Sequence, residues 1–257
     1  LTPENVLKEV ELLVDRYDAK VLWFYDDTFT YYPKRIEKIC DMMIERQLNV
    51  KWYCEVRVDL MTRALTKKMA EAGMFYAGFG IESGNERIAH DIIKKKATLK
   101  QAYQFIDWAH EFGVIPNPFF IFSNPTETWE EAQETLDVIE TVKDKCDISV
   151  AILHIYPGTE LEKRAYKEGK LPYDFTWTKE RDKRVIVLPA AQGHAPLYVD
   201  KLSWWQISEL IFHFTGAKKK KFSLARKIPA VLKNIYSFAD IQRYAILFLV
   251  LLRHKLK

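Results

Sequence analysis

Short apolar runs alternate with amphipathic stretches along the first 155 residues, with a repeat of roughly 30 residues. Strands that are separated by helices form parallel sheets, because the chain must cross back before it can enter the next strand. The pattern therefore predicts an α/β fold. The apolar runs lie at 21–25, 50–56, 74–81, 118–122 and 148–155, and the amphipathic stretches at 5–17, 35–46, 65–72, 99–112 and 129–143.

The starts of three helices carry a capping-box pattern, at 83–86, 98–101 and 128–131. Five strands are visible, and the chain opens with a helix that needs a preceding strand. Six or more units favour a partial (β/α)6 TIM-like barrel that lacks its first strand. A doubly wound sheet is less favoured because no glycine-rich phosphate loop follows the first strand.

The regular repeat ends after Gly158. We therefore expect two differently organised parts. A barrel, incomplete at its N-terminus, covers residues 1–172, and a mostly helical extension covers 173–257. Further helices are predicted at 159–168, 203–215, 223–236 and 238–253, and a short strand at 184–188.

The charge of the chain is divided unevenly along its length. The net charge is +4, but from Gly216 onward eight Lys and three Arg face one acid, Asp240. This basic end flanks an apolar stretch at 244–252, which is either a buried terminal helix or a peripheral membrane anchor. No recognition motif accompanies the charge, so nucleic acid is a less favoured partner.

The composition predicts a globular, cytoplasmic protein. Apolar residues make up 48% of the chain, yet no stretch reaches the roughly 18 residues of a membrane-spanning helix. Cys40, Cys54 and Cys146 are too far apart for a zinc or cluster motif, so we expect reduced, buried thiols. The first residue is not Met and no signal peptide follows it, which indicates a piece of a longer polypeptide.

Polar residues follow every predicted strand. In a parallel barrel the carboxyl ends of the strands surround the functional site, so these residues are the candidates. They are Asp26 and Asp27; Glu55 and Arg57; Glu82 and Ser83; Ser123, Asn124 and Glu127; and His154 and Tyr156.

The third visible strand is the most informative, because Gly78, Gly80 and Glu82 are spaced by two and share one face. The two missing side chains indicate a channel for a ligand beneath one carboxylate. A close helix–sheet contact, with Glu82 in an ion pair, is the alternative. Arg57 is a candidate to bind a ligand carboxylate or to pair with Glu55, and Ser83 is expected to cap a helix.

Strand alternation sends Asp26 and Asp27 to opposite sides, so at most one of them faces the barrel interior. A site built on a pair of carboxylates is therefore not expected there. His154 lies on an apolar strand and is expected to be a core histidine rather than a metal ligand.

Six motifs at the strand ends occur in the order found in radical S-adenosylmethionine (radical SAM) proteins. The chain resembles most the subgroup with a cobalamin-binding domain, which includes the anaerobic magnesium-protoporphyrin ester cyclase and hopanoid-associated enzymes. The resemblance covers residues 1–172. The motifs are 25–30, 52–59, 78–84, 94–98, 125–128 and 156–159.

The resemblance implies an enzyme that binds S-adenosylmethionine against a 4Fe-4S cluster and generates a 5′-deoxyadenosyl radical. It implies methylation, cyclisation or rearrangement of a small, apolar or tetrapyrrole-like substrate, with ferredoxin or flavodoxin as electron donor. Cobalamin is a further cofactor if an N-terminal domain precedes this chain. The implied cofactor-binding residues are Tyr25, Asp26 and Asp27 at the methionine amino group, Arg57, Glu82 and Ser83 at the carboxylate and ribose, Ser123, Asn124 and Glu127 near adenine, and Tyr156.

Two departures from that family pattern stand out. The three-cysteine cluster loop is absent and is expected upstream of Leu1, so this chain alone should be inactive. Ser123 and Thr126 replace glycines that relatives usually carry. The alternatives are a cluster-less barrel that acts as a binding module, or an unrelated TIM-barrel lyase such as an aldolase.

Overall fold

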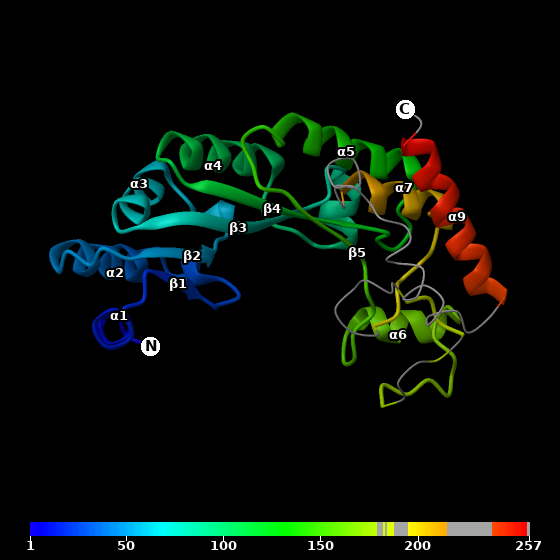
Figure 1. Ribbon diagram of the computed structural model, residues 1–257, viewed down its shortest axis with the longest axis horizontal. Coiled ribbons are helices and arrows are strands. Elements are labelled where there is room, and N and C mark those ends of the chain that lie inside the picture. The colour runs from blue at the N-terminus through cyan, green and yellow to red at the C-terminus, as the bar shows by residue number, and fades with distance from the viewer. Residues whose placement is uncertain (179–181, 183, 188–194, 215–237, 256–257) are drawn as a thin grey trace. The chain divides into compact units, whose positions relative to one another are not determined.

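The computed structural model describes residues 1–178, 182, 184–187, 195–214 and 238–255 (Figure 1). The chain divides into two compact units. The first unit contains residues 1–120 and 133–149, and the second contains residues 121–132 and 150–257.

Strands and helices alternate through the first 152 residues, as the sequence predicts. The sheet has five strands in the order β1-β2-β3-β4-β5, and the pairs from β1 to β4 are parallel. Strands that follow one another in chain order are typical of a barrel, whereas a doubly wound sheet reverses its order. The elements are α1 (Pro3–Tyr17), β1 (Val21–Phe24), α2 (Pro33–Glu45), β2 (Lys51–Glu55), α3 (Arg63–Glu71), β3 (Met74–Glu82), α4 (Leu99–Glu111), β4 (Ile115–Phe122), α5 (Trp129–Val142) and β5 (Ser149–Ile152).

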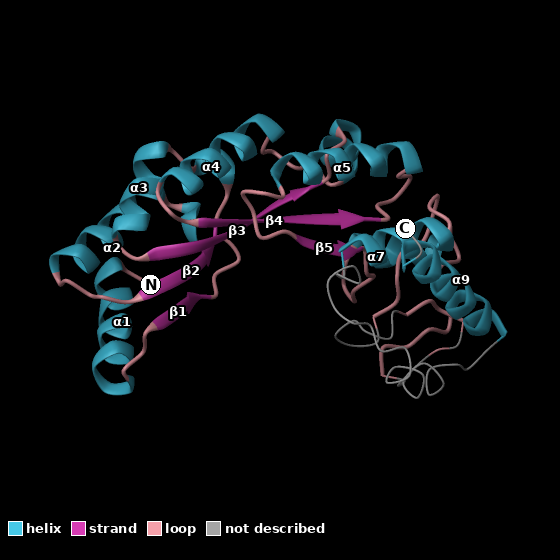
Figure 2. Ribbon diagram, turned by 45° about the horizontal axis from the view of Figure 1, so that its top comes forward, coloured by secondary structure: helices cyan, strands magenta, loops and turns pink. Residues whose placement is uncertain are grey.

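Helices α2, α3 and α4 lie on one face of strands β1 to β3 (Figure 2). Trp52 on β2 is fully buried beneath this layer, and its indole N–H donates to the Ala72 carbonyl at 2.8 Å. The following Gly73 has φ +105°, and a Cβ there would overlap the Val50 carbonyl. The tight turn from α3 into β3 therefore requires glycine.

The capping-box patterns in the sequence predicted two of the three helix starts correctly. Thr98 and Gln101 form a complete capping box on α4, and Thr128 and Glu131 exchange the same two hydrogen bonds at α5. The box predicted at 83–86 does not form, because the Ser83 hydroxyl accepts from the N–H of Asn85 instead. A short π-helix, Ile88–Ile92, follows.

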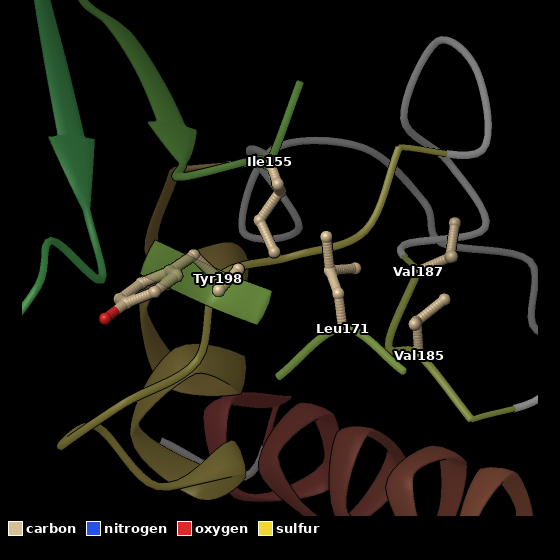
Figure 3. Packing of buried hydrophobic residues seen from close by; sticks show 6 residues of the cluster. Ile155, Leu171, Val185, Val187 and Tyr198 are labelled. Carbon is tan, nitrogen blue, oxygen red and sulfur yellow. The ribbon is translucent and has the colours of Figure 1, made fainter. Parts of the chain in front are cut away.

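The second unit has its own apolar core, drawn in Figure 3. An isolated antiparallel bridge joins His154 to Leu197 and brings the segment after β5 beside residues 196–198. The core forms between this bridge and helix α6 (Glu160–Lys167). Its buried residues are Ile155, Ala165, Leu171, Val185, Val187 and Tyr198.

Helices α7 (Trp204–Phe214) and α9 (Phe238–Lys255) pack together in the second unit. The Trp204 indole donates to the Arg243 carbonyl at 3.0 Å. The strand predicted at 184–188 is wrong for residues 184–187, which form no strand, and the helix predicted at 223–236 lies outside the described residues. Among the helices that the structure describes, none combines the length and apolarity needed to cross a membrane.

Candidate functional site

Three carboxylates follow or end neighbouring strands of the first unit: Asp27 after β1, Glu55 at the end of β2 and Glu82 at the end of β3. Burial raises the pKa of Glu55, and the charges of Asp27 and Glu82 raise it further. Both neighbours therefore lie close enough to Glu55 to repel its negative charge. We call these three residues the acidic row.

Asp26 and Asp27 lie in the turn after β1 and not on the strand itself, so the strand alternation expected for them does not apply. Burial, then the Cys40 thiol and the Asp26 carboxylate, raise the pKa of Cys54, which is fully buried next to Glu55 on β2. The charge of Asp26 therefore acts on Cys54, whereas that of Asp27 acts on Glu55. Tyr25 is 83% exposed and packs edge-on against Trp23.

Arg57 makes a bidentate ion pair with Asp59. Its Nε donates to Oδ1 at 3.1 Å and its Nη2 to Oδ2 at 2.7 Å. The hydrogen bond from Arg57 also lowers the pKa of Asp59. The pair with Glu55 considered from the sequence therefore does not form. Asp59 holds one edge of the guanidinium and orients the group.

Glu82 and Lys95 form a half-buried ion pair, with Nζ and Oε1 3.1 Å apart. Glu82 has φ +69° and follows an irregularity in the β3–β4 register, so its side chain folds back over Gly80. A Cβ at Gly80 would overlap the Glu82 carboxylate and lie 2.6 Å from the Lys95 ammonium. The space that the glycine leaves is thus occupied by this ion pair.

Gly78 is covered in the same way by aromatic side chains. A Cβ there would lie 2.5 Å from the Tyr53 hydroxyl and 2.7 Å from the Phe119 ring. The channel predicted beneath Glu82 therefore does not extend over Gly78, whereas Gly80 lines a cavity. The ion pair of Glu82 that was the alternative does form, with Lys95 as the partner.

A cavity of about 360 Å³ lies beside these ion pairs in the first unit. We call it the basic cavity, because four of the side chains that line it are cationic and one is acidic. No role was predicted from the sequence for Lys95 or Asp59, although the run of three lysines before α4 was a visible signal. The cavity is lined by Thr28, Val56, Arg57, Val58, Asp59, Gly80, Ile93, Lys94, Lys95, Lys96 and Ala97.

Ser83 lies at the turn after β3 and is buried. Its hydroxyl is 3.1 Å from the Thr135 hydroxyl, which also accepts from the Gly84 N–H at 2.9 Å. Ser83 therefore joins the end of β3 to α5. Its side chain acts in packing at this turn rather than as a helix cap.

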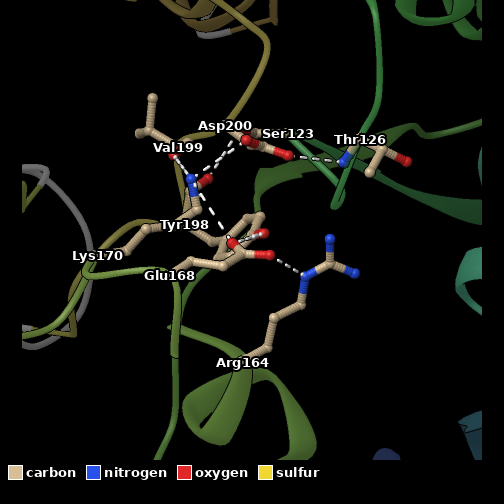
Figure 4. A network of polar contacts seen from close by, with 8 residues as sticks. All are labelled: Ser123, Thr126, Arg164, Glu168, Lys170, Tyr198, Val199 and Asp200. Atoms are coloured by element: carbon tan, nitrogen blue, oxygen red, sulfur yellow. Dashed lines mark hydrogen bonds and ion pairs between the residues drawn. The ribbon is translucent and has the colours of Figure 1, made fainter. Parts of the chain in front are cut away.

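The turn after β4 belongs to the second unit and has two residues in the left-handed region, Ser123 with φ +68° and Thr126 with φ +64°. The Ser123 hydroxyl donates to the Tyr198 carbonyl at 2.7 Å, and the Thr126 N–H donates to Asp200 at 2.9 Å (Figure 4). Lys170 in turn donates to Asp200 at 3.2 Å. These bonds hold the two left-handed residues of the turn in place.

Glu127 makes a hydrogen bond within the same turn. It is fully buried, and its Oε2 accepts from the Asn124 N–H at 2.9 Å, while Oε1 has no hydrogen-bond partner among the described residues. Burial raises the pKa of Glu127 to about 7. The side chains of Ser123, Asn124 and Glu127 are all buried and contact their own unit.

The residues after β5 differ in exposure. Tyr156 is 54% exposed, and its ring centroid lies 6.2 Å from that of His154. His154 is half-buried, and burial lowers its pKa, which favours a neutral imidazole. This agrees with a histidine that packs rather than titrates.

The described residues do not fit an iron–sulfur cluster. They contain no group of three or more His, Cys, Asp or Glu that would hold a metal ion. Burial raises the pKa of Cys40 and Cys146 to about 12, whereas cluster ligands are thiolates. The charged groups fit S-adenosylmethionine better, because carboxylates and the Arg57 guanidinium are the partners that its two cationic groups and its carboxylate need.

Comparisons with known proteins agree with this geometry. Residues 1–139 match the Radical SAM superfamily. An uncharacterized methyltransferase of Pyrococcus horikoshii is 33% identical over 179 residues, which cover 68% of this chain and 38% of that protein. The anaerobic magnesium-protoporphyrin IX monomethyl ester cyclase of Rubrivivax gelatinosus is 27% identical over 52% of this chain and 24% of its own length.

The fold has a solved counterpart in OxsB, a cobalamin-dependent S-adenosylmethionine radical enzyme with aqua-cobalamin bound. The TM-score is 0.64 at 16% identity, over 97% of this chain and 42% of that one. This likeness confirms the predicted partial TIM-like barrel. The chain spans between about a quarter and two-fifths of the length of the curated relatives that it matches. With more than half of its residues matched by the family, the chain belongs to the radical SAM superfamily of enzymes.

Proposed function

We propose that the first unit binds S-adenosylmethionine, with Asp27 facing its ammonium, Glu55 facing its sulfonium and Arg57 facing its carboxylate. The observation that carries this proposal is the position of Glu55, a half-buried carboxylate at the end of β2 that has the charges of Asp27 and Glu82 beside it; burial first, and then these two charges, raise its pKa. A carboxylate in such a setting favours a bound cation. S-adenosylmethionine carries two positive groups, a sulfonium and an ammonium.

The carboxylate of the ligand, which is on the same carbon as its ammonium, needs a cation. Asp59 occupies one edge of the Arg57 guanidinium and leaves Nη1 for a ligand carboxylate. A charge-assisted hydrogen bond of this kind contributes roughly 1.5–3 kcal/mol. In this proposal Glu82 accepts from the ribose hydroxyls while its Oε1 remains paired with Lys95. The ligand would supply a 5′-deoxyadenosyl radical in this superfamily.

We further propose that the full-length protein methylates, cyclises or rearranges a small substrate. The methyltransferase and cyclase relatives support this range of outcomes. The cluster ligands would come from outside the described residues, cobalamin from a separate domain, and the electron from a ferredoxin or flavodoxin. In this proposal residues 1–172 form the catalytic barrel and residues 173–257 the appended extension.

Affinity for two related ligands tests the cofactor assignment. S-adenosylhomocysteine has the same carboxylate and adenosine but lacks the sulfonium charge. Replacing Glu55→Gln should weaken S-adenosylmethionine binding at least fivefold in calorimetry and leave S-adenosylhomocysteine binding within twofold. Arg57→Ala should weaken both ligands at least tenfold. Glu45→Gln, at an exposed position on α2, is the matched control.

Equal effects of Glu55→Gln on the two ligands would contradict recognition of the sulfonium by the acidic row. Unchanged binding in Arg57→Ala would remove the carboxylate assignment. The two results are independent, because one reports on the sulfonium of the ligand and the other on its carboxylate.

A peripheral membrane contact is a second proposal, and helix α9 supports it. One side of α9 packs on α7, whereas Ile241, Phe248 and Leu252 are exposed on a shared side of the helix. Basic residues beside such an apolar face favour anionic lipid. Flotation with anionic vesicles should recover the full chain and lose it in the Phe248→Ser/Leu252→Ser variant. Equal partitioning of both would end the proposal.

A further inference from the structure

The basic cavity holds more positive charge than its own acids neutralise. Arg57 is paired with Asp59, and Lys95 with Glu82. Lys94 and Lys96 are exposed, line the cavity, and make no ion pair within the described part of the chain. The basic cavity therefore has two cationic side chains without an acidic partner among the described residues.

The backbone that carries these two lysines is fixed. The Lys95 N–H donates to the Ala89 carbonyl at 2.8 Å, and the Lys95 carbonyl is 2.8 Å from His90 Nδ1. Lys94 has φ +62°, a left-handed conformation that is unfavourable for a non-glycine residue. The run is thus held in one strained conformation between the π-helix and α4, rather than trailing into solvent. Strain of this kind is typical of binding sites.

S-adenosylmethionine does not account for the excess charge. Its sulfonium and ammonium outweigh its single carboxylate, so the ligand is itself a net cation at neutral pH. A net cation bound beside two unpaired ammonium groups does not neutralise their positive charge. A second, anionic ligand neutralises it.

We propose that the basic cavity binds a phosphate or phosphonate group of the substrate, held by Lys94 and Lys96. The proposal rests on the proposed function, because it treats the second ligand as the molecule on which the enzyme acts. Two unpaired ammonium groups match a dianion in charge, and a lysine binds phosphate as a point charge. A cavity of about 360 Å³ holds such a group together with part of a small molecule.

Calorimetric titration of the full chain with inorganic phosphate, at constant ionic strength, tests the site. The wild-type chain should bind phosphate, and the Lys94→Gln/Lys96→Gln variant should bind it at least tenfold more weakly. Lys100→Gln, an exposed lysine on α4 outside the cavity, is the matched control and should retain the wild-type affinity.

An unchanged phosphate affinity in the double variant overturns the proposal. Acetate bound as tightly as phosphate overturns the dianion class, since a single negative charge would then suffice. S-adenosylmethionine affinity is measured on the same samples and should stay within twofold in the double variant. Loss of phosphate binding with intact S-adenosylmethionine binding supports both proposals, whereas a chain that binds only phosphate keeps the anion site and removes the cofactor assignment.

Discussion

The carboxylate of Asp200 accepts a hydrogen bond at 2.9 Å from the backbone N–H of Thr126, which lies 74 positions earlier in the chain. Thr126 has φ +64°, where a β-branched residue is disfavoured by about 1–2 kcal/mol. The Asp200 contact therefore offsets a local strain. Lys170 supports it by donating to the other Asp200 oxygen at 3.2 Å.

Removing this contact should weaken the fold. Asp200→Ala leaves the Thr126 N–H without its acceptor, so we expect the free energy of unfolding to fall by about 1–3 kcal/mol in urea denaturation. Thr126→Gly should act in the opposite direction by about 0.5–1 kcal/mol, because glycine relieves the left-handed strain. An Asp200→Ala variant as stable as the wild-type chain would show that the hydrogen bond does not stabilise the turn.

Glu127 should give the protein a distinct pH dependence. Burial raises its pKa to about 7, above the ordinary value of 4.5, so the native state holds its proton more tightly than the unfolded state. The stabilisation is complete below about pH 4.5 and is lost as the pH rises to about 7. Glu127→Gln removes this titration.

The stability of Glu127→Gln relative to wild type should therefore rise by roughly 2–3 kcal/mol between pH 5 and pH 8. Denaturant titrations of both proteins at the two pH values measure this difference, in which the other titrating groups cancel. A difference that does not change with pH would place the Glu127 pKa near its ordinary value.

Gly80 should be sensitive to the smallest added side chain. The Cβ of Gly80→Ala would displace the Glu82 carboxylate and the Lys95 ammonium, so we expect S-adenosylmethionine affinity to fall at least fivefold. The loss should not add to that of Glu82→Gln, because both changes act through the same carboxylate. Gly169→Ala is the control: its Cβ meets open space but its φ of +67° disfavours alanine, so it should lower the stability and leave the affinity unchanged. Fully additive losses would argue against a shared cause.

The cysteines should react slowly with thiol reagents in the native state. Cys40 and Cys54 are fully buried, and burial raises the pKa of all three thiols. At pH 8 we expect Ellman's reagent to label these thiols at the rate of unfolding, and all three at once in guanidinium. Rapid labelling of a thiol in the native protein would show a reactive thiolate that this environment does not favour.

The sequence predicted the strands and helices to within a few residues where local signals were strong. Hydrophobic periodicity and the Thr98 and Thr128 caps depend on neighbours within four positions, so they are readable without the fold. The strand predicted at 118–122 begins three residues earlier, at Ile115, because two prolines obscured its start.

The pairing of charges was less predictable. Arg57 was expected to pair with Glu55 if it paired at all, and its partner Asp59 belongs to the turn that follows. Glu82 reaches Lys95 only because an irregularity in the β3–β4 register and φ +69° turn its side chain back. Such contacts depend on backbone geometry that residue spacing does not encode.

The sequence showed Ser123 and Thr126 where glycines were expected, but it did not show the contacts that stabilise these two residues. The two residues that support them, Tyr198 and Asp200, are more than 70 positions away. The turn after β4 and the segment at 198–200 are thus parts of one structural feature. A graft of this turn into another barrel must therefore include the segment at 198–200 as well, or have glycines at positions 123 and 126.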